Sequence, residues 1–164
     1  MRFRVEQDLA ADPDEAARAF ADPALYAALD GLPKVSRPEV LDRQVDGPIV
    51  RLRVRYRFAG HLSAAARAAV DPQRLSWVDE SEHDLSTRRV RFVLRPDHYA
   101  DRFRCRGEYR IEPRPDGCRR TADVELSVSF PLVGRAVERA IASGLREHLA
   151  DEAAVVEEHL RDHR

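Results

Sequence analysis

The feature that most constrains the fold is the change of pattern at Pro131. Before it, the chain alternates polar and apolar residues as β-strands do; after it, apolar residues recur mostly four positions apart over about thirty residues. That spacing predicts a helix with one buried face. Its apolar positions are Val133, Val137, Ile141, Leu145, Leu149, Val156 and Leu160. A small flat sheet would leave so long a one-sided helix partly uncovered. We therefore expect a curved antiparallel sheet that grips the helix, with room for a ligand cavity between them.

The segments before Pro131 predict about seven strands. The clearest alternation is in residues 50–58, where four arginines separate the apolar positions Val50, Leu52, Val54, Tyr56 and Phe58. The predicted strands are residues 1–9, 35–45, 50–58, 75–84, 87–95, 102–112 and 119–130. Most connections between them have hairpin length, which implies antiparallel pairing.

Two short helices are predicted directly after the first strand. Asp12-Pro13 and Asp22-Pro23 each combine an N-cap residue with proline at the first helical position. The first of these helices ends near Ala21 and the second before Gly31. The alanine-rich residues 62–70 predict a further short helix or lid. The fold class is therefore α+β: a strand, two short helices, about six more strands and a long C-terminal helix.

Length and composition limit the classes of function. A chain of 164 residues with 43% hydrophobic residues fits one soluble domain with a substantial core. The net charge of −1 gives no overall attraction to nucleic acid or to an anionic membrane. No apolar run reaches the length of a membrane span, and the N-terminus has no apolar signal-peptide region. We expect a cytoplasmic protein without stable membrane insertion.

A set of arginines shares one face of the predicted sheet. Its members are Arg51, Arg53, Arg55, Arg57, Arg89, Arg91, Arg102, Arg104, Arg106 and Arg110. A nucleic-acid surface needs an uncompensated positive field and interleaved aromatic side chains, but the aromatic residues of these strands have the opposite parity. With a tight hairpin at Asp116-Gly117, Arg106 lies opposite Glu125 and Arg110 is one pair from Asp123. We expect a solvated face with cross-strand ion pairs and no nucleic-acid partner.

The opposite parity predicts the sheet face that meets the terminal helix, where core and cavity wall are both possible. The candidate ligand-binding residues are Val54, Tyr56, Phe58, Trp77, Phe92, Phe103, Tyr109, Leu126, Val128, Ile141, Leu145, His148 and Leu149. The hydroxyl groups of Tyr56 and Tyr109 need hydrogen-bond partners if they are buried. Gly107, in the middle of a strand, is consistent with a kink that bends the sheet.

The candidate catalytic residues are His148 and Glu152. They are four positions apart on the terminal helix, near its apolar face, so their side chains can touch. An imidazole that is oriented by a carboxylate and faces a pocket can act as a general base. The sequence has no metal-ligand spacing such as HExxH or CxxC, no glycine-rich phosphate loop and no GxSxG elbow. We expect no metal and no cofactor.

The order of elements resembles the helix-grip fold of the START and Bet v 1-like (SRPBCC) superfamily, which includes polyketide cyclases and aromatases. More narrowly, the chain resembles a bacterial family of unknown function within it. The matching stretches are Arg55-Tyr56-Arg57-Phe58, Leu75-Ser76-Trp77-Val78-Asp79 and Pro131-Leu132-Val133-Gly134. The resemblance spans nearly the whole chain, so residues 1–164 are expected to form one helix-grip domain. It implies a hydrophobic cavity between sheet and helix, but no particular reaction.

Three functions are compatible with this sequence. The first, and the one we favour, is binding of a hydrophobic small molecule or lipid, without catalysis. The second is a cyclase-like or aromatase-like enzyme, for which His148, Glu152, Tyr56 and Tyr109 are the acid–base candidates; it requires that His148 and Glu152 are not solvent-exposed. The third is a partner-binding module without a small ligand, which a cavity too small for more than a few waters would favour. The sequence carries no signal of the oligomeric state.

Overall fold

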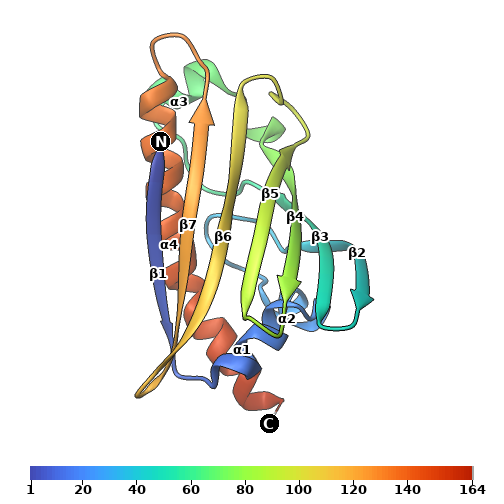
Figure 1. Ribbon diagram of the computed structural model, residues 1–164. Coiled ribbons are helices and arrows are strands. Elements are labelled where there is room, and N and C mark those ends of the chain that lie inside the picture. Colours follow the sequence, from blue (N-terminus) through green and yellow to red (C-terminus); the bar gives the residue numbers. More distant parts are fainter. Residues whose placement is uncertain (164) are drawn as a thin grey trace.

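The structure is a computed structural model that describes residues 1–163, and these residues form one seven-stranded antiparallel sheet and a long C-terminal helix (Figure 1). The strands are β1 (Arg2–Leu9), β2 (Glu39–Asp46), β3 (Ile49–Arg57), β4 (Ser76–Asp84), β5 (Arg89–Pro96), β6 (Phe103–Arg114) and β7 (Gly117–Val128). Their order in the sheet is β1-β7-β6-β5-β4-β3-β2. The helices are α1 (Pro13–Phe20), α2 (Pro23–Ala28), α3 (Ala64–Ala69), the 3-10 turn η1 (Pro72–Arg74) and α4 (Gly134–Asp162). The predicted α+β order is confirmed.

The short helices begin where their caps predict. The Asp12 carboxylate accepts hydrogen bonds from the backbone N–H groups of Asp14 and Glu15, and Asp22 accepts one from Ala24. These bonds satisfy donors that have no partner within the helix. α1 and α2 therefore form a bend that returns the chain from β1 to the opposite edge of the sheet.

The long helix begins later than the sequence predicts. Residues 131–133 form a turn, and α4 runs for 29 residues from Gly134. The backbone of Leu132 has a φ of +67°, a left-handed conformation that interrupts right-handed helix geometry. Gly134 then lies so close to the sheet that an added Cβ would be 2.7 Å from the carbonyl oxygen of Val128. The predicted start at Pro131 is therefore wrong, because the chain must first turn away from β7.

Strand β2 is also shorter at its start than predicted. The prediction began at Val35, but Val35 forms only an isolated bridge to Phe58, and the strand proper begins at Glu39. Pro38 has no backbone N–H to contribute to a ladder, which is consistent with pairing that starts directly after it. β2 is one of the two edge strands of the sheet, and most of its side chains are exposed.

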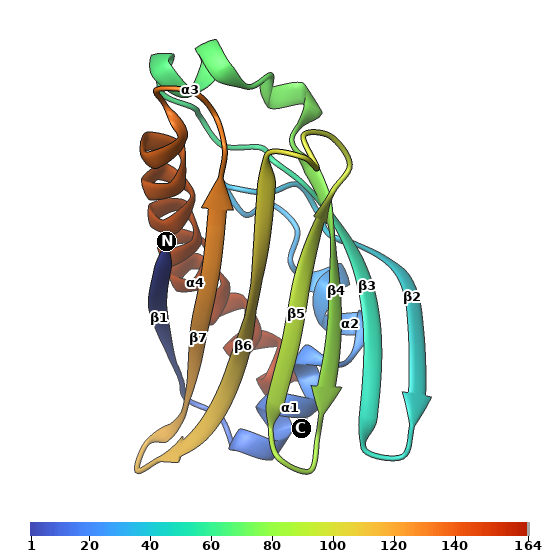
Figure 2. The same ribbon diagram turned by 45° about the horizontal axis from the view of Figure 1, so that its top comes forward.

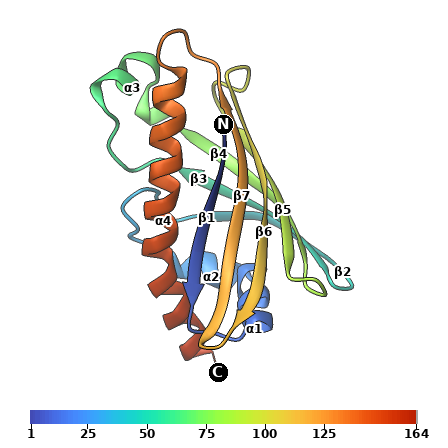
Figure 3. The ribbon, with the colours of Figure 1, turned by 60° about the vertical axis from the view of Figure 1, so that its left-hand side comes forward.

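The molecule has two layers, the sheet and α4, which Figure 3 shows edge-on. α4 packs mainly on β1 and β7, while α1 packs on β6 and β7 and α2 on β2, both at the C-terminal end of α4. α3 lies at the opposite end, beside the start of α4 (Figure 2). The core accordingly has two clusters. One includes Phe20, Leu25 and Val156 near α1 and α2; the other includes Leu126 and Leu149 under β7.

The outer face of the sheet carries the predicted ion pairs. Arg106 lies opposite Glu125 and bonds to it, and Arg110 bonds to Asp123 from one pair away. Arg51 and Arg91 share Glu82. Further ion pairs on this face are Arg53–Glu80, Arg55–Asp97, Arg89–Glu108 and Arg95–Glu80. This face is therefore a network of paired, partly exposed charges.

Candidate functional site

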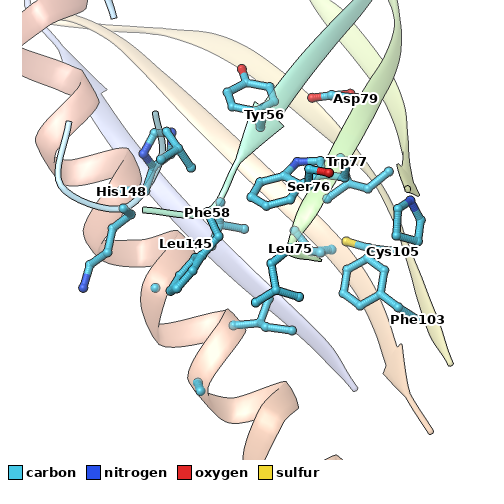
Figure 4. Close-up of a pocket in the computed structure, with 18 of the residues that line it drawn as sticks. Tyr56, Phe58, Leu75, Ser76, Trp77, Asp79, Phe103, Cys105, Leu145 and His148 are labelled. Carbon is cyan, nitrogen blue, oxygen red and sulfur yellow. The ribbon is translucent and has the colours of Figure 1, made fainter. Parts of the chain in front are cut away.

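A cavity of about 480 Å³ lies between the inner face of the sheet and α4, and Figure 4 shows part of its wall. This volume is within the range of small-molecule sites in proteins. Ile141 and Leu145 pack against the core cluster under β7 but are only half-buried, because part of each side chain faces the cavity. The cavity exceeds the space that a few waters would fill.

The predicted wall residues come together here with two exceptions. The cavity is lined by Tyr56, Phe58, Trp77, Phe92, Phe103, Tyr109, Val128, Ile141, Leu145, His148 and Leu149. Val54 and Leu126 do not line it, and their side chains are 1% and 0% exposed within the two core clusters. The alternation of residues along a strand shows which side chains point inward, but it cannot show which of them line the cavity and which are packed in the core. That distinction depends on where the helices cover the sheet.

The cavity opens toward α3 and is closed toward α1 and α2. Its exposed lining residues include His61, Ser63 and Arg74 from the segment around α3, and Ser143 and Glu147 from α4. At the other end, α1, α2 and the residue after α2 contribute only buried side chains to the lining, which are Phe20, Tyr26 and Leu29. A ligand would therefore enter between α4 and residues 58–75.

Aromatic side chains form much of the wall. Tyr56 and Trp77 face each other across β3 and β4 with ring centroids 5.9 Å apart and planes 12° from parallel (Figure 4). Phe92 lies over Gly107, where an added Cβ would be 2.7 Å from its ring. Gly107 therefore makes room for an aromatic ring in the wall, which the sequence prediction of a kink did not identify.

A buried ion pair closes the α1–α2 end of the cavity. Arg120 Nη1 lies 2.9 Å from Glu152 Oε1, and the two side chains are only 10% and 7% exposed. The Arg120 guanidinium also lies 3.8 Å from the ring centroids of both Phe20 and Tyr109. Two aromatic faces and one carboxylate therefore enclose this cation.

The predicted pair His148 and Glu152 is part of this cluster. His148 Nε2 lies 3.4 Å from Glu152 Oε2, and both residues line the cavity. The Gln7 amide donates to the Leu149 carbonyl oxygen at 2.7 Å and lies 3.4 Å from Glu152 Oε1. Burial raises the pKa of Glu152, but the His148 hydrogen bond and the Arg120 charge outweigh burial and hold that pKa below its ordinary value. Glu152 can thus orient His148, while its own basicity is low.

Besides Glu152 and the exposed Glu147, which pairs with Lys34, the cavity is lined by a third acid, Asp79, which has no such partner. It lies on β4 between Val54 of β3 and Leu94 of β5. Its Oδ1 is buried and accepts no hydrogen bond from any residue in the described part of the chain. Burial raises the pKa of Asp79 to about 7, although the charge of Arg120 opposes this rise. At neutral pH Asp79 can therefore both donate and accept a proton.

Sequence reasoning missed Asp79, Arg120 and Gln7, although a signal was present. Asp79 points to the same side of β4 as Trp77, and Arg120 points to the same side of β7 as Leu126. Gln7 likewise shares the parity of the apolar residues of β1, and Gln7 is 4% exposed. A polar residue at an inward position of a strand needs a partner or a purpose, because its burial is costly.

An antiparallel sheet that grips a long C-terminal helix, with two short helices after the first strand, defines the helix-grip fold. Residues 4–160 match the profile of a family described as "Protein of unknown function (DUF2505)". The chain belongs to this family. A search of curated protein sequences found no match. Among residues 1–163, no helix is long and apolar enough to cross a membrane.

Solved structures share this fold at low sequence identity. The crystal structure of TTHA0849 from Thermus thermophilus aligns with a TM-score of 0.69 and 20% identity, over 99% of each chain. The Zhui aromatase/cyclase from Streptomyces sp. R1128 aligns with a TM-score of 0.59 and 19% identity, over 100% of this chain and 94% of that chain. Ara h 8.0201 aligns with a TM-score of 0.59 and 11% identity, over 99% and 98%. At these identities the likeness establishes the fold.

Proposed function

We propose that the protein binds a hydrophobic small molecule or lipid in the cavity between the sheet and α4. The supporting observation is the cavity of about 480 Å³, whose wall is mostly apolar and includes the half-buried Ile141 and Leu145. A ligand that removed this apolar surface from water would gain roughly 25 cal/mol per Å² before the costs of association. A cavity of this size also favours a small ligand over a module that only binds partner proteins.

Gly144 offers a direct way to test the site. It lies on α4, lines the cavity, and has no atom within 4 Å of the position of an added Cβ. Gly144→Phe should therefore fill part of the cavity, while Gly144→Ala should leave most of it open. The probe is N-phenyl-1-naphthylamine, a neutral dye that fluoresces in apolar surroundings. We expect saturable binding to the wild type and to Gly144→Ala, and at least tenfold weaker binding to Gly144→Phe.

Equal dye binding to all three proteins would show that the dye binds elsewhere, and no binding to the wild type would contradict the proposed function. Solvent extraction of freshly purified protein, followed by mass spectrometry, provides a second readout. An acyl or aromatic compound that co-purifies with the wild type but not with Gly144→Phe would support the proposal.

An acid–base enzyme is the second candidate, supported by the burial of His148 and Glu152 against the cavity. His148 Nε2 contacts Glu152, and its buried Nδ1 has no hydrogen-bond partner in the described chain. The test is incubation with a reactive 1,3,5-triketone, comparing wild type, His148→Gln and buffer. A cyclised product specific to the wild type and lost in His148→Gln would favour the enzyme. Identical product mixtures in all three samples would count against it.

A further inference from the structure

Several polar groups of the cavity have unused hydrogen-bonding capacity. Asp79 Oδ1 and His148 Nδ1 are buried without a hydrogen-bond partner in the described chain. The hydroxyl groups of Tyr56 and Tyr109, which also line the cavity, make no hydrogen bond to residues 1–163. By contrast, the Tyr26 hydroxyl donates to the Phe20 carbonyl oxygen at 2.7 Å. Two of the five buried side-chain atoms without a partner in the described chain, those of Asp79 and His148, therefore belong to this cavity. Most buried polar groups in proteins have partners, so these two require an explanation.

Asp79 is the most conspicuous of these groups because of its row in the sheet. The residues paired across β3 to β7 at this level are Val54, Asp79, Leu94, Cys105 and Leu126. Asp79 is the only polar side chain in a row that otherwise holds aliphatic groups and a thiol. A leucine there would fit a purely apolar container. Figure 4 shows the Asp79 side chain on the cavity side of β4, near the ring of Tyr56.

The charges around Asp79 restrict the partner that could satisfy it. Arg120 is the cation that acts on Asp79, and it is already paired with Glu152 at 2.9 Å. An anionic ligand group would meet Asp79 and would have to compete with Glu152 for Arg120. A cationic ligand group would be attracted by Asp79 but repelled by Arg120. A neutral hydroxyl group avoids both conflicts, since it can donate to Asp79 and accept from a tyrosine.

We propose that the ligand of this cavity is a neutral alcohol or phenol with an apolar skeleton, and that its hydroxyl group hydrogen-bonds to Asp79. This inference rests on the proposed function, because it identifies the polar end of a ligand whose apolar part the cavity holds. The aromatic pair Tyr56 and Trp77 lies next to Asp79 on β3 and β4 and would contact the adjoining skeleton. A hydrogen bond to a buried acid should strengthen binding about tenfold or more over the same skeleton without the hydroxyl group.

The test measures displacement of N-phenyl-1-naphthylamine by naphthalene, 2-naphthol and 2-naphthoate at pH 7. An apolar cavity without a polar recognition site should prefer naphthalene, because 2-naphthol is better solvated by water. We expect 2-naphthol to bind the wild type at least tenfold more tightly than naphthalene, and 2-naphthoate to bind most weakly. Asp79→Leu should abolish the preference for 2-naphthol, and the isosteric Asp79→Asn should reduce it to a few-fold. Glu80→Gln, at the neighbouring position on the outer face, should leave it unchanged.

Each outcome separates the two proposals. If the dye binds but naphthalene matches or exceeds 2-naphthol, or if Asp79→Leu keeps the preference, the assignment to Asp79 is wrong and the apolar container stands. If 2-naphthoate binds most tightly, the site recognises anions through Arg120 and the assignment is also wrong. If neither the dye nor any naphthalene binds the wild type, the proposed function fails, and this inference fails with it. Should Asp79→Leu not fold, Asp79→Asn alone decides.

Discussion

The charged side chains on the two faces of the sheet differ in burial and in pairing. On the outer face, arginines pair with acids on neighbouring strands, and both partners remain partly exposed. On the inner face, Arg120 is a buried cation enclosed by Glu152, Phe20 and Tyr109, while Asp79 has no hydrogen-bonding partner among the described residues. The comparison teaches that the many outer charges contribute little and are exchangeable, whereas the few inner charges are costly to bury and therefore informative about function.

Neighbouring arginines on β7 offer the sharpest test of this comparison. Arg119 pairs with Glu6 and Asp8 on the outer face, and Arg120 pairs with Glu152 inside. Arg120→Met should lower the free energy of unfolding by about 3–5 kcal/mol, because it leaves the Glu152 carboxylate buried without its cation. Arg119→Met should cost only a small fraction of that. Urea denaturation of both variants at pH 7 measures the difference.

The double variant Arg120→Met/Glu152→Leu provides the control for that prediction. It removes both buried charges, so it should recover most of the stability that Arg120→Met loses. Equal losses for Arg119→Met and Arg120→Met would mean that the two faces do not differ energetically as described.

The pH dependence of stability tests the unpaired acid. The pKa of Asp79 is about 7 in the folded protein and near 4 in an unfolded chain. Between these values the folded state binds more protons, so the contribution of Asp79 to stability falls as pH rises from about 4 to about 7. Asp79→Asn does not titrate there. The free energy of unfolding of Asp79→Asn should therefore rise relative to that of the wild type by on the order of 2–4 kcal/mol between pH 4 and pH 8.

This gain should level off above pH 7, and denaturation curves of both proteins across the pH range measure it. Glu80→Gln, one position away on the outer face, removes ion pairs with Arg53 and Arg95 and should show no comparable gain. A stability difference between Asp79→Asn and wild type that did not change with pH would contradict the buried, unpaired state of Asp79.

Two glycines of α4 give the smallest predicted effects, and they have opposite signs. Gly144→Ala should raise the free energy of unfolding by about 0.5–1 kcal/mol, because alanine favours a helix and the added Cβ meets no atom within 4 Å. Gly134→Ala should lower it, because the same Cβ would be 2.7 Å from the Val128 carbonyl oxygen. Thermal unfolding compares them. A gain for both would mean that the start of α4 is not held against β7.

Local patterns in the sequence predicted most of the fold. The caps at Asp12 and Asp22 began helices as expected, and Arg106 and Arg110 of the outer face had their predicted partners. The start of α4 was missed because the left-handed turn at Leu132 arises from how the chain leaves the sheet. The candidate site was predicted only in part. Alternation identified inward residues, but which of them line a cavity depends on how helices from distant parts of the chain cover the sheet.

The same limit explains why the buried polar cluster was overlooked. His148 and Glu152 were paired from helical spacing, which is a local property. Their link to Arg120 joins residues 32 positions apart, and the link from Gln7 to Glu152 spans 145 positions. No local pattern encodes such contacts, although the inward parity of Arg120 did mark it as unusual.

The central claim is that the cavity binds an apolar molecule, and Trp77 allows it to be measured inside the site. Trp77 is the one tryptophan of the chain and lines the cavity, so its emission can pass to bound N-phenyl-1-naphthylamine. Titration with the dye should quench Trp77 emission saturably with one dye per chain, and Gly144→Phe should shift this quenching to at least tenfold higher dye concentrations. Unchanged Trp77 emission in wild type at saturating dye, or equal quenching in Gly144→Phe, would contradict the account.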